Sequence, residues 1–145
     1  MVINSPCKGT VKDLKYAKDK VFSQYMMGVG FYVETDDKDI LSPVEGKISY
    51  VAETKHAILI ESEDVNIMVH VGLDTCALKG SPFTVFVDEG ESVKVGQKLM
   101  EVDHELIKQN GLNSDVIVVL VENNDTSLLD DLVDFVEAGN VVINR

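Results

Sequence analysis

The stretch Asn4-Ser5-Pro6-Cys7-Lys8-Gly9-Thr10-Val11 recurs, 37 positions further along, as Leu41-Ser42-Pro43-Val44-Glu45-Gly46-Lys47-Ile48. Both copies read Ser-Pro, two variable residues, Gly, one variable residue and a β-branched residue. Proline fixes φ and lacks an amide hydrogen, and glycine tolerates a left-handed turn, so each copy predicts an extended entry, a bend and a strand. Turn chemistry that recurs by chance is one explanation; the other is a duplicated element, which is typical of a sandwich or barrel with pseudo-symmetry.

Short β-type runs, separated by Gly, Asp, Asn, Ser or Pro, fill most of the remaining chain. The expected strands are residues 30–34, 47–51, 56–61, 65–71, 98–102, 115–122 and 141–143. Many short strands with such punctuation are typical of an all-β sandwich or barrel. We therefore predict an all-β fold, an antiparallel β-sandwich or flattened barrel with a duplicated β motif and one or two short helices.

Two segments carry helical signals. Residues 105–109 can form one turn that ends at Asn110-Gly111. The spacing of apolar residues predicts a helix over 127–136, with Asp125 or Thr126 as its cap and Gly139 beyond its end. Its apolar stripe consists of Leu128, Leu129, Leu132, Val133 and Val136.

Composition narrows the class of protein. The chain has 145 residues, 45% of them hydrophobic, which favours a single domain over residues 1–145. The net charge of −12 disfavours nucleic acid and favours a basic protein partner. No apolar run approaches the roughly 18 residues of a membrane helix, and the N-terminus does not resemble a signal peptide. Cys7 and Cys76 form no disulfide or metal-binding pattern, so we expect a cytoplasmic domain with reduced thiols.

The main functional signal comes from His56 and His70, which lie in two consecutive strand-like runs. The polar residues Ser62-Glu63-Asp64 separate these runs. If only these three residues form the loop, His56 stands directly opposite His70, with Cβ atoms roughly 4.5–5.5 Å apart. The prediction depends on parity, because a loop one residue different in length places the histidines on opposite faces.

Two adjacent imidazoles fit three interpretations: half of a zinc site, a nucleophile with an electrophilic helper, or a surface pair without a role. Thr54 can orient the ring of His56, and Asp74 follows His70 just beyond the strand end. We expect His70 to be the nucleophile, because a neutral imidazole can attack a phosphoryl group, and His56 to stabilise the phosphoryl oxygens. The chain has no glycine-rich nucleotide loop of the GxxxxGK type.

Apolar residues are expected to surround the two histidines as a docking surface, although core packing is the better interpretation of each one singly. These residues are Val29, Phe31, Ile40, Leu41 and Met68. His104, in a polar turn, is expected to be solvated, and Cys76 to be a small buried residue.

The motifs around both histidines resemble the glucose-type enzyme IIA domain of the bacterial phosphoenolpyruvate-dependent sugar phosphotransferase system. They are Glu53-Thr54-Lys55-His56-Ala57, Val69-His70-Val71-Gly72-Leu73-Asp74-Thr75 and Leu78-Lys79-Gly80, with Ser42-Pro43-Val44 upstream and Glu89-Gly90 to Gly96-Gln97 downstream. The resemblance implies a phosphocarrier: His70 would accept a phosphoryl group from phosphorylated HPr and pass it to a cysteine of a IIB domain of a IIBC sugar permease. It also implies His56 and Thr54 as supporting residues and Asp74 as a contact to basic residues of HPr.

The resemblance implies no required cofactor, but in regulatory complexes of similar proteins zinc lies between the two histidines and a partner's carboxylate. Two positions depart from the family pattern: Val29 replaces an aspartate that is frequent between two glycines, and Cys76 replaces an aliphatic residue. A zinc-dependent hydrolase of related duplicated β fold stays open, because His70 to Asp74 fits an HxxxD motif, and so does a purely regulatory binding module. A lipoyl-type carrier lacks its lysine motif.

Overall fold

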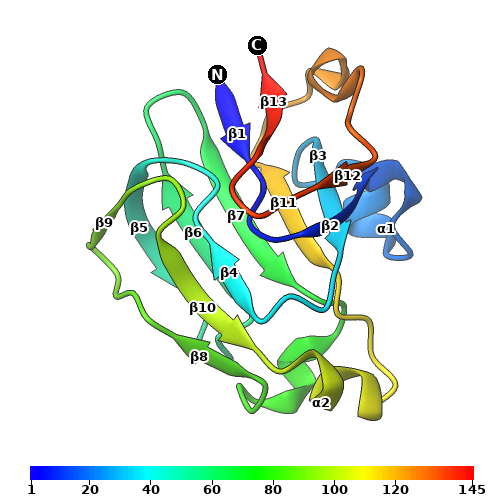
Figure 1. Ribbon diagram of the computed structural model, residues 1–145, viewed down its shortest axis with the longest axis vertical. Helices are drawn as coiled ribbons and strands as arrows, with labels where there is room; N and C mark the ends of the chain where they lie inside the picture. The colour runs from blue at the N-terminus through cyan, green and yellow to red at the C-terminus, as the bar shows by residue number, and fades with distance from the viewer.

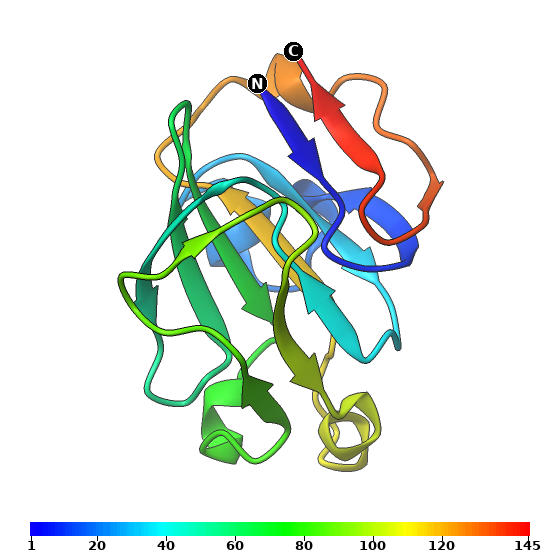
Figure 2. The ribbon, with the colours of Figure 1, turned by 60° about the vertical axis from the view of Figure 1, so that its left-hand side comes forward.

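The computed structural model describes residues 1–145, and strands dominate it (Figures 1 and 2). An eight-stranded antiparallel sheet has the order β12-β2-β3-β11-β7-β6-β5-β9, a second sheet has the order β4-β10-β8, and β1 pairs with β13. The strands are β1 (Val2–Asn4), β2 (Gly9–Asp13), β3 (Gly30–Glu34), β4 (Asp39–Leu41), β5 (Gly46–Val51), β6 (Ala57–Glu61), β7 (Asn66–Val71), β8 (Phe83–Val85), β9 (Ser92–Val93), β10 (Lys98–Val102), β11 (Val116–Leu120), β12 (Phe135–Val136) and β13 (Val141–Asn144). The helices are α1 (Lys20–Ser23) and α2 (His104–Gln109), with 3-10 turns η1 (Leu14–Tyr16), η2 (Thr75–Leu78) and η3 (Thr126–Leu129).

The predicted all-β sandwich is confirmed, with two short helices and no closed barrel. All seven expected strands are present to within two residues at each end. The turn expected over 105–109 is α2. None of the helices combines the length and the apolar character that crossing a membrane would require.

The duplicated motif is present in the structure. The Ser5 hydroxyl donates to the Cys7 carbonyl oxygen at 2.6 Å, and the Ser42 hydroxyl donates to the Val44 carbonyl oxygen at 2.7 Å. Each turn leads into a strand that begins with glycine, β2 or β5. A Cβ atom on either glycine would lie 2.2 Å from a carbonyl oxygen of the neighbouring strand, so a larger residue would displace the backbone.

The two copies of the motif also bond to each other reciprocally. The backbone amide of Asn4 donates to the Pro43 carbonyl oxygen at 2.9 Å, and the backbone amide of Leu41 donates to the Pro6 carbonyl oxygen at 2.8 Å. Asn4 and Leu41 hold equivalent places in the two stretches, as do Pro6 and Pro43. The repeat is therefore a pseudo-two-fold arrangement.

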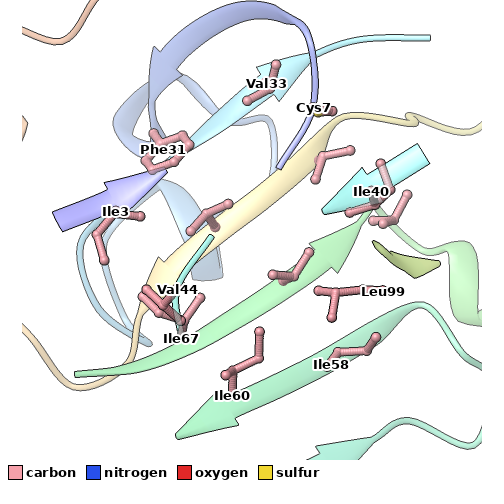
Figure 3. Close-up of a cluster of buried hydrophobic side chains, with 14 of the residues drawn as sticks. Ile3, Cys7, Phe31, Val33, Ile40, Val44, Ile58, Ile60, Ile67 and Leu99 are labelled. Atoms are coloured by element: carbon pink, nitrogen blue, oxygen red, sulfur yellow. The ribbon is translucent and has the colours of Figure 1, made fainter. Parts of the chain in front are cut away.

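The main core lies between the sheets and contains 28 buried residues. Figure 3 shows Ile58 and Ile60 of β6 in this cluster together with Leu99 of β10 and Ile40 of β4. On β7, Val69 and Val71 belong to the same cluster and are fully buried. Because side chains alternate along a strand, the residues between and before them point to the outer face of the large sheet.

A second, smaller cluster covers this outer face. Its buried members are Leu14, Phe22, Tyr32, Met68, Ile117 and Val119. Four of these residues lie on strands β3, β7 and β11 of the large sheet. The other two, Leu14 and Phe22, belong to residues 14–27, which we name the cover segment. The cover segment contains η1 and α1, and Figure 1 shows α1 beside β2 and β3. His70 stands directly opposite Ile117 of this cluster, so its side chain lies on the same outer face.

The helix predicted over 127–136 is wrong. Only η3 forms a short turn there, and Asp131 then adopts a left-handed φ of 61°. Phe135 and Val136 form β12, which pairs with β2. Aspartate competes with helical backbone bonds and favours turns, and the edge of β2 offers hydrogen-bond partners that a helix could not use. The apolar spacing therefore reflects burial of single residues and not a helical face.

Two smaller expectations also fail. His104 is not solvated but buried, and its Nε2 donates to the Asp37 carbonyl oxygen at 2.7 Å. Cys76 is exposed, whereas Cys7 is the buried cysteine, and burial raises the pKa of the Cys7 thiol to about 12.

Candidate functional site

The imidazole rings of His56 and His70 contact each other edge to face, with centroids 4.9 Å apart and planes at 82°. The predicted direct pairing across β6 and β7 is nevertheless wrong, because Ala57 stands opposite His70. The loop is one residue longer than assumed, since the Ser62 amide and hydroxyl both donate to the Val65 carbonyl oxygen. His56 therefore stands opposite Val71, whose amide donates to the His56 carbonyl oxygen at 2.8 Å.

The rings still meet because His56 lies outside β6. The chain enters β6 through a turn in which Lys55 has a left-handed φ of 62°. The Lys55 amide donates to the Ala52 carbonyl oxygen at 2.8 Å, and the Ala52 amide donates to the Ala57 carbonyl oxygen at 2.9 Å. Strand alternation does not govern a residue in such a turn, so the side chain of His56 reaches the face on which His70 lies.

Thr54 holds the ring of His56 from the same turn. Its Oγ1 lies 2.6 Å from Nδ1 of His56. When the hydroxyl donates to Nδ1, the ring proton resides on Nε2, which can then donate to an anionic oxygen. Burial lowers the pKa of His56, so the neutral ring prevails at neutral pH.

His70 is the more enclosed of the two. Its Nδ1 is inaccessible to solvent, so Nε2 is the nitrogen that can meet a ligand. Burial and the neighbouring His56 lower the pKa of His70 to about 4, and the smaller effects of the Gly72 backbone and Asp19 oppose this shift. At neutral pH the ring therefore presents an uncharged nitrogen, which is what nucleophilic attack requires.

A shallow cavity of about 140 Å³ opens over the two rings. Its walls come from the cover segment, from both histidines and from the chain that follows β7. The lining residues are Asp19, Phe22, His56, His70, Leu73, Asp74, Thr75 and Cys76. Two carboxylates stand in this wall, so the cavity suits a partner that carries positive charge.

Asp74, one of the predicted partner contacts, is exposed in this wall. It has a left-handed φ of 60° and immediately precedes η2. The Thr75 hydroxyl donates to the Val71 carbonyl oxygen at 2.5 Å, which anchors the turn to the end of β7. Asp19 is a second acidic residue at the cavity, which the sequence analysis did not identify; its carboxylate caps α1 by accepting the Val21 amide at 2.8 Å. In the sequence, Asp19 could have been recognised only as a possible N-cap of a short helix, because aspartate is a preferred residue at that position.

The predicted apolar docking surface is wrong in its residues. Val29, Phe31 and Ile40 are fully buried in the main core, and Met68 is buried in the outer cluster. Leu41 is half-buried on β4. Apolar residues on buried strands pack into the core, which leaves only Leu41 of these side chains partly open to a partner. Because Val29 lies in the core, the acidic side chain expected at this place in the family has no counterpart there.

Three exposed apolar residues lie at positions 21 to 27 of the cover segment, which contributes Asp19 and Phe22 to the cavity wall. They are Val21, Met26 and Met27, with 41%, 68% and 37% of their surface exposed. The Met26 amide donates to the Val21 carbonyl oxygen at 3.1 Å, so these two residues are neighbours. We name Val21, Met26 and Met27 the apolar rim. No sequence pattern marks the apolar rim, because a helix of four residues is too short to produce a periodic signal.

Comparison with known proteins identifies the family to which the chain is similar. The model of the phosphoenolpyruvate-dependent sugar phosphotransferase system, EIIA 1 family matches residues 1–126. The beta-glucoside-specific EIIBCA component of Bacillus subtilis is 44% identical over 126 residues, which cover 86% of this chain and 20% of that protein. The glucose-specific EIIA component of Oceanobacillus iheyensis is 38% identical over 86% of this chain and 76% of its own.

A solved structure shows the same fold. Glucose permease IIA from Mycoplasma capricolum superimposes with a TM-score of 0.86 at 33% identity, covering 99% of this chain and 94% of that one. The chain therefore belongs to the EIIA 1 family of the sugar phosphotransferase system, and the resemblance based on its motifs is confirmed. It is a phosphotransferase component with a phosphocarrier role, and these similarities give no support to a zinc hydrolase or a purely regulatory module. The chain spans only about a fifth of the fused relative.

Proposed function

We propose that His70 Nε2 is the atom that carries the phosphoryl group. The observation that carries this proposal is the pair of rings: His70 is held neutral with Nδ1 enclosed, and His56 contacts it edge to face. The lone pair of Nε2 attacks the phosphorus of a phosphohistidine, a new N–P bond forms, and the N–P bond of the donor breaks. The donor imidazole carries a proton on its other ring nitrogen, so it leaves with that electron pair as a neutral ring, while His70 keeps its proton on Nδ1 and becomes a phosphorylated imidazolium.

His56 supports both steps without forming a bond to phosphorus. With Thr54 engaged at Nδ1, its Nε2–H can donate to a phosphoryl oxygen and offset negative charge as the transfer proceeds. In the second step a cysteine thiolate of the acceptor attacks the phosphorus, and the N–P bond on His70 breaks. The electron pair returns to Nε2, which restores the neutral ring.

We propose HPr as the donor and a IIB domain of a IIBC permease as the acceptor. The acidic residues Asp19 and Asp74, beside the apolar rim, fit a basic partner surface with an apolar centre. Relatives named EIIBCA and EIICBA carry the A part in one chain with B and C parts, which supports the acceptor. The relatives are named for glucose or beta-glucosides, so we propose that the transported sugar belongs to this class. We also propose that the phosphoryl transfer takes place in the cytoplasm.

Zinc belongs to this proposal only as a regulatory ion. Two imidazoles can supply two ligands, and no third His, Cys, Asp or Glu of the chain joins them in a metal-binding group. A zinc ion here would therefore need ligands from a partner, such as a carboxylate. We propose no cofactor for the phosphoryl transfer itself.

The test is phosphorylation of the purified chain by phosphoenolpyruvate, enzyme I and HPr, followed by mass spectrometry. The wild-type chain should gain one phosphoryl group, and His70→Gln should gain none. His56→Gln should accept the group but pass it slowly to a IIB domain. Undiminished labelling of His70→Gln would overturn the assignment of the carrier atom.

A further inference from the structure

We propose that Tyr25 and Asp13 form a latch that holds the cover segment, and with it Phe22, against the ring of His70. The inference rests on the proposed function, because it assigns positioning residues to the same site. Tyr25 would act through Phe22 and touch neither the phosphoryl group nor its donor.

The cover segment has little structure of its own to hold it in place. Its helix α1 has four residues and its turn η1 has three. Helical segments this short do not persist by themselves, so contacts with the rest of the protein must fix them. Leu14 and Phe22 supply part of this by packing in the outer cluster.

The Tyr25–Asp13 latch supplies the polar contacts that hold the cover segment in place. The Tyr25 hydroxyl donates to Asp13 Oδ1, and the same oxygen accepts the Lys15 amide at 2.9 Å. Asp13 is the last residue of β2 and pairs with Phe31 of β3, so the acceptor belongs to the rigid sheet. One carboxylate oxygen thereby joins the sheet to η1, through Lys15, and to the turn that follows α1, through Tyr25.

The backbone of Tyr25 ends the helical turn of α1, where the Met26 amide donates to the Val21 carbonyl oxygen at 3.1 Å. It has a left-handed φ of 56°, which residues other than glycine seldom adopt without support. Its ring packs against both the main core and the outer cluster. Burial, followed by the hydrogen bond to Asp13, raises the pKa of Tyr25, so the hydroxyl keeps its proton and remains a donor at neutral pH.

The latch reaches the phosphoryl site through Phe22. The Tyr25 amide donates to the Phe22 carbonyl oxygen at 3.1 Å, so the two residues share one turn. The Phe22 ring meets His70 edge-on, with centroids 5.1 Å apart and planes at 62°. His70 is thus held between Phe22 and His56. If the segment loosened, water would reach the His70 ring, and its orientation and its neutral state would both be less well defined.

Tyr25→Phe tests the latch, because it removes only the hydroxyl and keeps the ring in both clusters. Tyr50→Phe is the matched control, since Tyr50 lies half-exposed on β5. Two quantities are measured: the pKa of His70 by NMR of the imidazole, and kcat and KM for transfer from phosphorylated HPr. We expect Tyr25→Phe to raise the pKa of His70 by about one unit and to lower kcat/KM about tenfold, with Tyr50→Phe unchanged.

A second variant separates positioning from general stability. Phe22→Leu should raise the pKa of His70 similarly, and adding Tyr25→Phe to it should produce little further change, because both act through one contact. An unchanged pKa of His70 in folded Tyr25→Phe, or full additivity in the double variant, would refute the latch. If phosphoryl transfer itself fails in the wild-type chain, the proposed function fails, while the NMR result still decides the latch.

Discussion

The ring of His56 contacts the ring of His70 although the two residues are not paired across β6 and β7. The contact depends on the left-handed turn at Lys55, which releases His56 from the alternation of the strand. One ring is therefore held by a regular strand and the other by a turn. This division suits the roles proposed for them, since a nucleophile must stay fixed while a residue that donates to the phosphoryl oxygens must adjust as charge moves.

Replacing His56 should affect the rate of phosphoryl transfer more than the binding of the partner protein. His56→Gln is expected to lower kcat for transfer from His70 to a IIB domain by about 10²–10³, because a donor to the phosphoryl oxygens is lost, with KM nearly unchanged. Rapid-quench measurement of phosphoryl transfer checks this. A Thr54→Val variant should show a smaller loss in the same direction, since it removes only the orienting hydroxyl. A large change of KM alone would argue that His56 binds the partner.

The depressed pKa of His70 has a consequence for stability. Its ordinary value is 6.5 and its folded value is about 4, so between these pH values the unfolded chain binds a proton that the folded chain does not. Folding therefore becomes less favourable as the pH falls through this window, by up to about 3 kcal/mol, and nothing is lost above it. Urea unfolding at pH 7 and pH 4.5 measures the effect. His70→Gln should lose less stability than the wild-type chain over the same interval, and an equal loss would contradict the prediction.

The close approach at the start of β5 predicts a strong effect of one added methyl group. Gly46→Ala places a Cβ atom 2.2 Å from the Glu61 carbonyl oxygen, so we expect a loss of about 3 kcal/mol or more from displaced backbone. Gly90→Ala is the control, because no atom lies within 4 Å of its Cβ position and only its φ of 90° opposes the change. It should cost about 1 kcal/mol. Thermal unfolding of both variants decides between steric and conformational causes.

The duplicated turns should respond alike to the same substitution. Ser5→Ala and Ser42→Ala each remove a buried hydroxyl from a carbonyl oxygen that it bonds, so each should cost about 1–2 kcal/mol. Denaturant unfolding measures both. A difference of several kcal/mol between them would show that the two copies do not contribute equivalently.

Charge at the cavity should control encounter with the donor. Asp74→Lys is expected to raise KM for phosphorylated HPr about tenfold and to weaken its dependence on salt, because the side chain is exposed beside the histidines. Glu63→Lys is a matched control of the same charge change, since Glu63 lies in the loop at the opposite end of the β6–β7 hairpin. If both variants raise KM for phosphorylated HPr equally, the net charge of the protein and not the local site is responsible.

The sequence predicted the strands well because their signal is local. β3 and β10 match the predicted ranges at both ends, and each is bounded by turn residues. The register of β6 and β7 was not predictable, because it depends on whether Val65 closes the loop, and one residue reverses every face. The helix over 127–136 failed for a different reason: its outcome depends on the edge of β2, more than a hundred positions away in the chain.

Site residues could be predicted where they are of a rare type, such as histidine, and not where they are of a common type, such as the apolar residues. The chain has only three histidines, so it was visible in the sequence that two of them lie close together, although not that their strand pairing differs by one residue. Apolar residues are abundant, and nothing in the local pattern distinguishes the buried Phe31 from the exposed Met26. That distinction arises only when the cover segment folds over the outer cluster.

The reciprocal bonds between the Ser-Pro stretches bear on how such a domain could arise. The Asn4 amide meets the Pro43 carbonyl, and the Leu41 amide meets the Pro6 carbonyl. Two copies of one such stretch related by a two-fold axis would make these same two bonds to each other. The two stretches are thus related to each other as equivalent segments are across the two-fold axis of a symmetric dimer, although they belong to one chain.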